Sequence, residues 1–579
     1  MAATVYRHRE QSPDLVLFQR PRADDRWLDV TASDFADEVL AVAKGLIASG
    51  IQVGDRVAIH SATRYEWVLL DYAIWAVGAC TVAVYDSSAA DQVRWILRDS
   101  GAALLITETE RHRALAIEAS TDAPDLREIL TIDADAVGEL VRRGTDLDDA
   151  AVRQRLRQIG PHSPATLIYT SGTTGRPKGA VLTHGNLAAE VHAVVSVADG
   201  LLGPGRKTVL FLPLAHVFAR VISVGAVEAG ATVVHSSDWS TLPQQFATHR
   251  PDFVLAVPRV FEKVFTTAEQ TARDAGRGHV FDRAVSTAIA WSRARDTGRA
   301  GLQLRLEHKL FDRLVYARIR SALGGRCTQA VSGGGPLGAR LSEFFRGAGI
   351  TVYEGYGLTE TSAAVTLNTP GSIRVGSVGR PIPGQSVRVA ADGELLLRGP
   401  VVFGGRWNNP QATAEAFEDG WFRSGDLGEI DADGFVTVTG RKKEIIVTAA
   451  GKNVSPAQLE DVLRADPLVN QAMVVGDGRP FIGALITLDA AALPGWKQRH
   501  GVAADTPLTQ LTAHPTLLAE IEAVVARANA TVSNAERIKR IRVLDADWTQ
   551  ESGELTPKLS LKRAVVAAKF AAEIEALYR

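Results

Sequence analysis

The sequence has few cysteines, almost no net charge and no long apolar run. Cys80 and Cys327 are the only cysteines among 579 residues, which argues against a disulfide framework or a cysteine metal site and favours a reducing cytosol. The 64 Lys and Arg residues nearly balance the 66 Asp and Glu residues, so the basic excess expected of a nucleic-acid binder is missing. No run of about 18 apolar residues occurs, and the N-terminus has no signal-peptide core. We therefore expect a soluble cytoplasmic protein, with peripheral membrane contact left open.

What the sequence does contain is a regular alternation of short β-rich runs with amphipathic segments. Such alternation predicts buried strands joined by crossover helices, and hence a doubly wound α/β architecture. The clearest runs lie at residues 56–61, 103–108, 128–133, 165–169, 232–237 and 253–258. Residues 261–323 are rich in Ala, Arg, Glu and Leu at helical spacing, which predicts a mostly helical insert.

After residue 385 the pattern changes to paired alternating runs. Asp392-Gly393 and Asp433-Gly434 each stand between two such runs, which is typical of β-hairpins. We therefore expect an antiparallel β subdomain that closes the large N-terminal region.

A smaller α+β unit is predicted at the C-terminal end. We place the boundary near residue 440, which gives a large domain at 1–440 and a small domain at 441–579. The small domain is predicted to contain, in order, a helix after Ser455-Pro456, a hairpin across 476–480, a helix near 515–529 and a strand near 538–544.

One short segment, YTSGTTGRPKGA at 169–180, concentrates hydroxyls and glycines and carries a lysine, Lys178. It follows a predicted strand, where α/β sheets place ligand loops, and glycine amides together with hydroxyls donate well to anions. It is not a Walker A motif, because Pro177 and Gly179 replace the glycine and the magnesium-binding hydroxyl. The segment predicts a polyphosphate loop, with an ordinary glycine turn as the alternative. Its candidate binding residues are Thr170, Ser171, Gly172, Thr173, Thr174 and Gly175.

Further stretches supply groups that suit a nucleotide. A second glycine turn at 332–338 offers a surface for a flat base, and YEGYGLTE at 353–360 gives an aromatic ring followed by a carboxylate. Asp426, in WFRSGDLG, suits a ribose diol, because a carboxylate accepts two hydroxyl donors. Arg441 opens the stretch GRKKE. Taken singly, Asp426 is equally well a helix cap, and Arg441 a surface cation in a solvated charge run.

The order and spacing of these stretches resemble the adenylate-forming (ANL) superfamily, which includes acyl-CoA synthetases, luciferases and peptide-synthetase adenylation domains. The resemblance runs from about residue 30 to the end of the chain. The segments 207–221 and 257–264, with the helical insert, look most like long-chain fatty-acid–CoA ligases. It implies an enzyme that uses ATP, Mg²⁺ and coenzyme A, with an AMP- and acyl-binding domain at 1–440 and a small mobile domain at 441–579.

The resemblance also implies a role for each matching residue. The loop from Thr170 to Lys178 contacts the ATP phosphates, while Thr359 and Glu360 serve the α-phosphate and Mg²⁺, with Glu360 as metal ligand. Asp426 takes the ribose hydroxyls with Arg441 nearby. The remaining positions are Gly333, Gly334, Gly335, Pro336, Tyr356 and Gly357 around the adenine, Lys443 at a hinge, and Gly451 beside the pantetheine arm.

The reaction implied has two halves. The fatty-acid carboxylate attacks the α-phosphorus of ATP and releases pyrophosphate, and the coenzyme A thiol then displaces AMP from the acyl-adenylate. Relatives carry a C-terminal lysine that reaches the reacting groups; here GELTPKLSLKR offers both Lys558 and Lys562, and we favour Lys558. Two other functions stay open: an acyl-AMP ligase that serves a carrier protein, and a nucleotide-binding regulator with weak chemistry.

The residues of the acyl pocket are the hardest to identify from the sequence. His216, in PLAHVF, aligns with a position that lines the acyl or carboxylate end of the pocket in relatives, and a packed core histidine is the alternative. Trp239 resembles a gating tryptophan, although a core or surface indole is the simpler interpretation. We expect a long-chain preference, because each buried methylene contributes about 0.8 kcal/mol.

Overall fold

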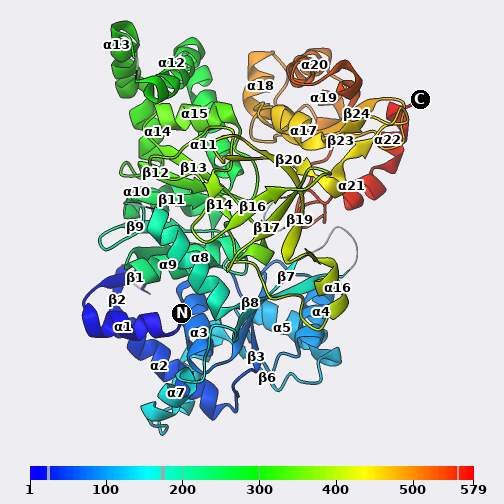
Figure 1. Ribbon diagram of the computed structural model, residues 1–579. Helices are drawn as coiled ribbons and strands as arrows, with labels where there is room; N and C mark the ends of the chain where they lie inside the picture. The colour runs from blue at the N-terminus through cyan, green and yellow to red at the C-terminus, as the bar shows by residue number, and fades with distance from the viewer. Residues whose placement is uncertain (23–25, 171–175, 199, 299, 557–559) are drawn as a thin grey trace.

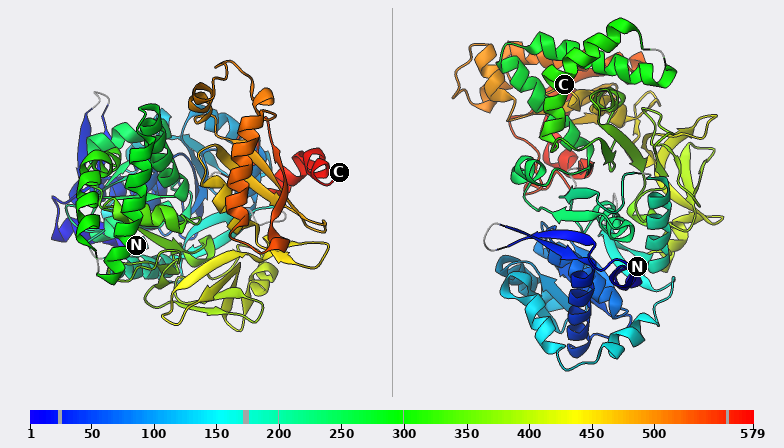
Figure 2. Two further views of the ribbon diagram at one scale, coloured as in Figure 1. Left: turned by 90° about the horizontal axis from the view of Figure 1, so that it is seen from above. Right: turned by 90° about the vertical axis from the view of Figure 1, so that its left-hand side faces the viewer.

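The computed structural model describes residues 1–22, 26–170, 176–198, 200–298, 300–556 and 560–579. It is a mixed α/β protein with a large N-terminal domain and a separate C-terminal domain. In Figure 1 the first doubly wound sheet lies at the bottom, the helical insert at the upper left and the small domain at the upper right. Figure 2 shows the helical insert and the small domain at the same end of the molecule.

The first sheet has the strand order β6-β5-β3-β4-β7-β8, and its neighbours are parallel except for β7 and β8. Its strands are β3 (Arg56–His60), β4 (Cys80–Val84), β5 (Leu104–Thr107), β6 (Glu128–Thr131), β7 (Pro164–Thr170) and β8 (Lys178–Thr183). Its flanking helices are α2 (Ala32–Ala48), α3 (Tyr65–Ala76), α4 (Ala90–Ser100), α5 (Glu110–Ala119), α6 (Ala136–Arg143) and α7 (Asp149–Leu156). β4 is buried along its whole length because helices cover both faces of a parallel sheet.

Two further sheets carry the middle of the chain. One has the order β2-β1-β10-β9 and the other the order β11-β12-β13-β14-β15. The strands are β1 (Val16–Pro21), β2 (Trp27–Thr31), β9 (Lys207–Leu210), β10 (Thr232–His235), β11 (Phe253–Ala256), β12 (Gln329–Ser332), β13 (Thr351–Tyr356), β14 (Thr366–Leu367) and β15 (Arg380–Pro381). The helices outside the insert are α1 (Ala3–Gln11), α8 (His184–Val197), α9 (Val217–Ala229), α10 (Leu242–His249) and α15 (Ala339–Gly347).

The helical insert forms as expected between β11 and β12. It consists of α11 (Pro258–Asp274), α12 (Gly278–Thr297), α13 (Leu302–Phe311), a π-helical turn (Asp312–Tyr316) and α14 (Ala317–Ala322). Its inner face is aromatic, since Phe265 packs edge-on against Phe281 and Phe344.

The predicted antiparallel subdomain is confirmed. Its order is β16-β17-β19-β18, with β20 paired to β19. Both Asp-Gly pairs lie in turns, the first between β16 and β17 and the second between β19 and β20. The elements are β16 (Ser386–Val389), β17 (Glu394–Arg398), α16 (Pro410–Glu415), β18 (Phe417–Glu418), β19 (Trp421–Ile430) and β20 (Val436–Arg441).

The small domain has its own apolar cores, built from residues between 446 and 577. Its sheet is β23-β24-β25, and the helix, hairpin and strand predicted from the sequence all occur. The elements are β21 (Ile446–Val447), β22 (Asn453–Val454), α17 (Pro456–Arg464), β23 (Val469–Val475), β24 (Ile482–Leu488), α18 (Leu493–Arg499), α19 (Leu508–Leu511), α20 (Pro515–Asn529), β25 (Ile538–Val543), α21 (Arg563–Lys569) and α22 (Ala571–Leu577). It rests on the insert through Arg259 of α11, which pairs with Asp489 at 3.1 Å.

No helix in the described part of the chain is both long enough and apolar enough to cross a bilayer.

Candidate active site

The glycine-rich segment joins two antiparallel strands. β7 and β8 pair in register from Thr170 opposite Lys178, so the loop is the connection of a hairpin, and no helix follows it. The strand before the loop was predicted, but the return strand β8 was not. Lys178 is exposed at the start of β8. Ser171, Gly172, Thr173, Thr174 and Gly175 lie outside the described residues.

Both flanks of this hairpin are fixed by tryptophans. The indole N–H of Trp95 donates to the carbonyl of Pro177 at 2.7 Å, and the Arg176 guanidinium lies 4.8 Å from the centre of the same ring. On the other flank the backbone N–H of Trp407 donates to the carbonyl of Gly179 at 2.8 Å. A Cβ at Gly179 would lie 3.2 Å from the Trp407 Cβ, so glycine permits this close approach.

A buried cation connects the hairpin to Glu360. One guanidinium nitrogen of Arg406 donates to Glu360 Oε1 at 2.6 Å and another donates to Thr170 Oγ1 at 3.2 Å. The Arg406 and Glu360 side chains expose only 15% and 11% of their surface. The guanidinium also lies 5.1 Å from the centre of the Phe403 ring. Arg406 therefore neutralises the one carboxylate that the sequence assigns to the metal.

The backbone around Glu360 is tightly folded. Thr359 and Glu360 lie in a 3₁₀ turn, with Thr359 half-buried. A Cβ at Gly357 would lie 1.5 Å from the carbonyl oxygen of Ala363, so no larger residue fits there. Ala363 itself has φ +113°, a conformation that residues other than glycine rarely adopt. The turn that presents Glu360 is thus held by direct backbone contact.

Three of the residues that the resemblance assigned to the nucleoside form one chain of polar contacts. The Tyr356 hydroxyl donates to Asp426 Oδ2 at 2.8 Å, and Arg441 Nε lies 3.2 Å from Asp426 Oδ1. Asp426 and Arg441 are paired directly across β19 and β20. Burial raises the pKa of Asp426, and the Arg441 charge opposes that rise. Asp426 is therefore neither a helix cap nor solvated, and each of its carboxylate oxygens already has a donor.

The second glycine turn lies beside this chain. Gly333, Gly334, Gly335 and Pro336 follow β12, whose last residue is in register with Glu354 of the neighbouring strand β13. Glu354 accepts a hydrogen bond from the N–H of Leu337 at 3.1 Å, and burial raises its pKa to about 6. Since the carboxyl ends of parallel strands meet at one sheet edge, the turn and the Tyr356–Glu360 segment lie together there.

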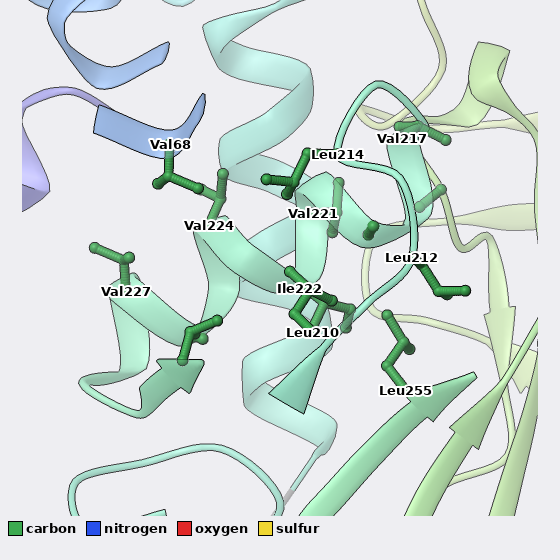
Figure 3. Close-up of a cluster of buried hydrophobic side chains, with 14 of the residues drawn as sticks. Val68, Leu210, Leu212, Leu214, Val217, Val221, Ile222, Val224, Val227 and Leu255 are labelled. Carbon is green, nitrogen blue, oxygen red and sulfur yellow. The ribbon is translucent and has the colours of Figure 1, made fainter. Parts of the chain in front are cut away.

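His216 lies directly before α9, and Trp239 lies after β10, at the start of a 3₁₀ turn. His216 caps α9 through Nδ1, which accepts the N–H of Phe218 at 3.2 Å. Trp239 exposes 42% of its surface and packs edge-on against Phe211 at 5.2 Å. In Figure 3 the side chains of Leu212 and of α9 residues such as Val221 and Ile222 lie in one buried cluster. His216 is thus a half-buried helix cap, and Trp239 is a surface indole anchored on a core ring.

A buried ion pair behind the site was not predicted. Arg220 of α9 donates through Nε to Asp71 Oδ2 at 2.9 Å and also contacts Thr166 of β7. The guanidinium lies between the rings of Trp67 and Trp75, at 5.0 and 5.3 Å from their centres. This pair fixes α3 and α9 to the strand that carries the glycine-rich loop.

The two adjacent lysines at the predicted hinge, Lys442 and Lys443, differ in their contacts. Lys442 Nζ donates to Asp392 and Glu394, at 2.5 and 3.0 Å. Lys443 is exposed and has no ion pair among the residues that the structure describes. Gly451 lies in open space with φ +76°.

Of the two candidate C-terminal lysines, the structure describes Lys562. An isolated β-bridge joins Leu555 to Leu561, and the backbone N–H of Lys562 donates to the Glu554 carbonyl at 2.7 Å. Lys562 is half-buried. Lys558 falls outside the described residues, so the structure gives no ground for preferring either lysine.

The donor set suits a metal that arrives with phosphate. Among the described residues no group of three or more His, Cys, Asp or Glu side chains could hold an ion by itself. Mg²⁺ is usually bound by one or two carboxylates together with substrate phosphates, which matches a single carboxylate at Glu360.

Comparison with known proteins gives a consistent result. Residues 5–407 match the AMP-binding enzyme family, and residues 443–579 match the AMP-binding enzyme C-terminal domain. The long-chain-fatty-acid–CoA ligase FadD15 of Mycobacterium bovis is 54% identical over 100% of this chain and 97% of its own length. The ligase ACSBG2 of Gallus gallus is 30% identical over 96% of this chain and 78% of its own. The anthranilate CoA ligase AuaEII has the same fold, with TM-score 0.75 at 20% identity over 99% of this chain and 98% of that one.

Proposed function

Because the chain belongs to the AMP-binding enzyme family, we propose that it is a long-chain fatty-acid–CoA ligase. It joins a fatty acid to ATP, giving acyl-adenylate and pyrophosphate, and then transfers the acyl group to coenzyme A with release of AMP. The 54% identity to a ligase of that name, over the whole chain, carries the proposal. The grouping of a phosphate-facing hairpin, a buried Arg–Glu pair and a Tyr–Asp–Arg chain supports it.

In the first half-reaction the fatty-acid carboxylate and the triphosphate, both anions, must approach each other. Catalysis therefore depends on positioned cations and hydrogen-bond donors. Arg406 already spans the distance from Thr170 to Glu360, at the mouth of the glycine-rich hairpin. On nucleotide binding Arg406 turns from Glu360 to the phosphates, and Lys178 adds a second cation. Glu360, so released, would be the residue that holds Mg²⁺, with Thr359 on the α-phosphate. Bound Mg²⁺ supplies neutralisation of phosphate charge.

On the other side of the proposed site, the nucleoside replaces some of the hydrogen-bond partners that Asp426 has in the structure. Asp426 accepts the ribose hydroxyls, while Arg441 stays beside it and keeps the carboxylate ionised. The adenine lies between Tyr356 and the turn at 333–336, whose exposed Gly334 and Gly335 present backbone amides.

The second half-reaction uses the small domain, which we place at 441–579 after a large domain at 1–440. The C-terminal family match begins at 443 and the small domain's core begins at Ile446, both close to this boundary. Lys443 is the hinge, and the open space at Gly451 suits the pantetheine arm. Lys442, on the large-domain side of this hinge, is tied to Glu394, which fixes the chain up to the hinge. In the other orientation of the small domain, during adenylation, Lys558 or Lys562 reaches the carboxylate and the α-phosphate.

The acyl chain lies along the segment between His216 and Trp239. The His216 side chain is at the carboxylate end, and the indole of Trp239 is at the mouth. Its partial exposure on top of a buried Phe211 suits a side chain that moves.

Two assays test the function. ATP–pyrophosphate exchange driven by a fatty acid should be observed, and added coenzyme A should give the thioester. Acids from acetate to a chain of about 20 carbons should show activity that rises with length. Exchange without thioester would instead indicate an acyl-AMP ligase, and no exchange with any acid would indicate a nucleotide-binding regulator.

A further inference from the structure

Four leucines lie exposed in a single row on the helical insert. Leu302, Leu306, Leu310 and Leu314 expose 74, 62, 55 and 47% of their surface. Twelve large apolar side chains are exposed among the described residues, and the other eight are spread over separate elements. This leucine row is therefore the concentrated apolar surface that marks a contact with a partner or a membrane.

The backbone keeps the row straight. In an α-helix every fourth residue advances by about 40° around the axis, so a long row winds away from its starting face. The helix α13 (Leu302–Phe311) passes directly into a π-helical turn (Asp312–Tyr316), whose wider hydrogen-bond ring reduces the rotation per residue. Leu314 is thereby brought back beside Leu310.

The opposite face of the same helix already holds it to the protein. Phe311 is buried, the His308 ring stacks on Trp291 at 4.3 Å, and the Tyr316 hydroxyl donates to the Ala284 carbonyl at 2.7 Å. Figure 1 shows α13 at an outer corner of the molecule, with α12 on its inner side. The leucine row is therefore not needed to attach the helix.

Unpaired cations run alongside the leucines. Arg305, Lys309 and Arg313 each immediately precede a leucine of the row and are exposed, and none has an ion pair in the described ranges. The two acidic residues of the same stretch are already engaged, Glu307 by Arg283 at 2.9 Å and Asp312 by Arg320 at 2.7 Å. The outer face thus combines apolar surface with positive charge that nothing on the helix compensates.

We propose that this face docks on an anionic lipid bilayer. A helix that carries leucines beside Lys and Arg lies in the membrane interface, with its apolar side chains in the acyl boundary and its cations at the anionic headgroups. A second copy of the chain is a poorer occupant, because pairing two such faces brings their cations together with no acidic complement. The inference does not depend on the proposed reaction, although a ligase for long-chain acids would meet its amphiphilic substrate there.

The direct test is flotation of the full chain with vesicles, without ATP or acid. Vesicles of phosphatidylcholine with about 30% phosphatidylglycerol should bind the protein, and pure phosphatidylcholine should bind it much less. Binding should weaken between about 50 and 500 mM NaCl, since salt screens surface charge.

Matched variants locate the contact. Leu306→Gln with Leu310→Gln should lower the vesicle partition coefficient roughly tenfold or more. Val53→Gln with Ile117→Gln replaces exposed apolar side chains elsewhere and should leave it unchanged.

A second pair of variants tests the charge. Arg305→Gln, Lys309→Gln and Arg313→Gln together should lower binding roughly 10- to 100-fold at low salt and remove its salt dependence. The matched control, in which exposed arginines are replaced elsewhere, carries Arg111→Gln, Arg157→Gln and Arg537→Gln.

Every variant should keep the circular dichroism spectrum of the unaltered chain and its rate of ATP–pyrophosphate exchange with a short-chain acid. These two controls distinguish a loss of membrane docking from a loss of folding or of enzyme activity. Absence of vesicle binding by the unaltered chain, or undiminished binding by the leucine variant, overturns the proposal. A third outcome also overturns it: the unaltered chain self-associates, and replacing the leucines makes it monomeric without changing vesicle binding. A second copy of the chain would then cover the leucine row.

Discussion

Replacing Arg406 is the sharpest test of how the site handles charge. Its guanidinium donates to Glu360 at 2.6 Å and to Thr170 at 3.2 Å, and both members of the ion pair are almost buried. If Arg406 turns to the phosphates in the adenylation step, Arg406→Gln removes a preorganised donor. Such a loss costs about 100- to 1,000-fold in rate, equivalent to about 2.7–4 kcal/mol of transition-state stabilisation.

Arg406→Lys separates charge from geometry. Lysine keeps the positive charge but lacks the planar guanidinium that reaches two oxygens at once. We therefore expect an exchange rate between that of the unaltered chain and that of Arg406→Gln. Arg398→Gln, an exposed arginine on the neighbouring β17, is the control and should change the rate less than about threefold.

The measurement is ATP–pyrophosphate exchange at varied ATP and varied Mg²⁺, beside a thermal unfolding curve for each variant. A purely structural Arg406 would lower the melting temperature and leave the kcat/KM for ATP nearly intact at low temperature. An Arg406→Gln enzyme that is within about threefold of the unaltered kcat/KM would refute the proposed role.

Four further predictions concern the residues around the nucleotide. Arg220→Met should lower the free energy of unfolding by about 3–5 kcal/mol in urea melts, because it leaves buried Asp71 without its counter-ion; a change under 1 kcal/mol would count against that pair. Glu354 has a pKa of about 6 against a usual 4.5, so the folded state holds the extra proton and stability should fall by about 2 kcal/mol as pH rises from 4.5 through 6. Glu354→Gln should abolish that slope. Asp426→Asn should raise the KM for ATP at least about tenfold, and an unchanged KM would remove Asp426 from the ribose site. Lys558→Ala and Lys562→Ala should differ, with adenylation collapsing in one and barely changing in the other; equal effects would mean that neither is the reaching lysine.

Local patterns were sufficient to predict most of the fold. All six apolar runs become strands, and in five of them four or five consecutive residues are buried, as expected for the interior of a covered sheet. The sixth, β6, lies at the edge of its sheet and has two buried residues. The two Asp-Gly pairs become turns because glycine tolerates the positive φ that each position has, +86° at Gly393 and +83° at Gly434. The α/β class, the helical insert and the antiparallel subdomain all follow from these local signals.

The pairing of charges could not be predicted in the same way. Arg406 stands in GGRWNNP, a stretch with no feature that distinguishes it from a surface arginine, and its partner lies 46 residues away. Arg220 occurs inside an apolar helix, which is a usable signal that a buried anion must exist, but nothing local identifies Asp71. The return strand after the glycine-rich loop was also missed, because its pairing with β7 depends on a neighbour and not on its own composition.

The pre-formed pairs have a consequence for nucleotide binding. A buried carboxylate without a hydrogen-bond donor costs several kcal/mol of stability. In the described structure Glu360 already has a donor in Arg406, and Glu354 has one in the N–H of Leu337. Asp426 has two, Tyr356 and Arg441. If these groups bind ATP as proposed, ATP gains from them only the difference between its own interactions and those it displaces. Adenosine without phosphates would leave the Arg406–Glu360 pair intact, so under the proposed roles it would forgo only that difference. Under the proposed roles, the pre-formed pairs therefore keep these buried carboxylates satisfied before the nucleotide binds and reduce the net gain from each contact that the nucleotide makes with them.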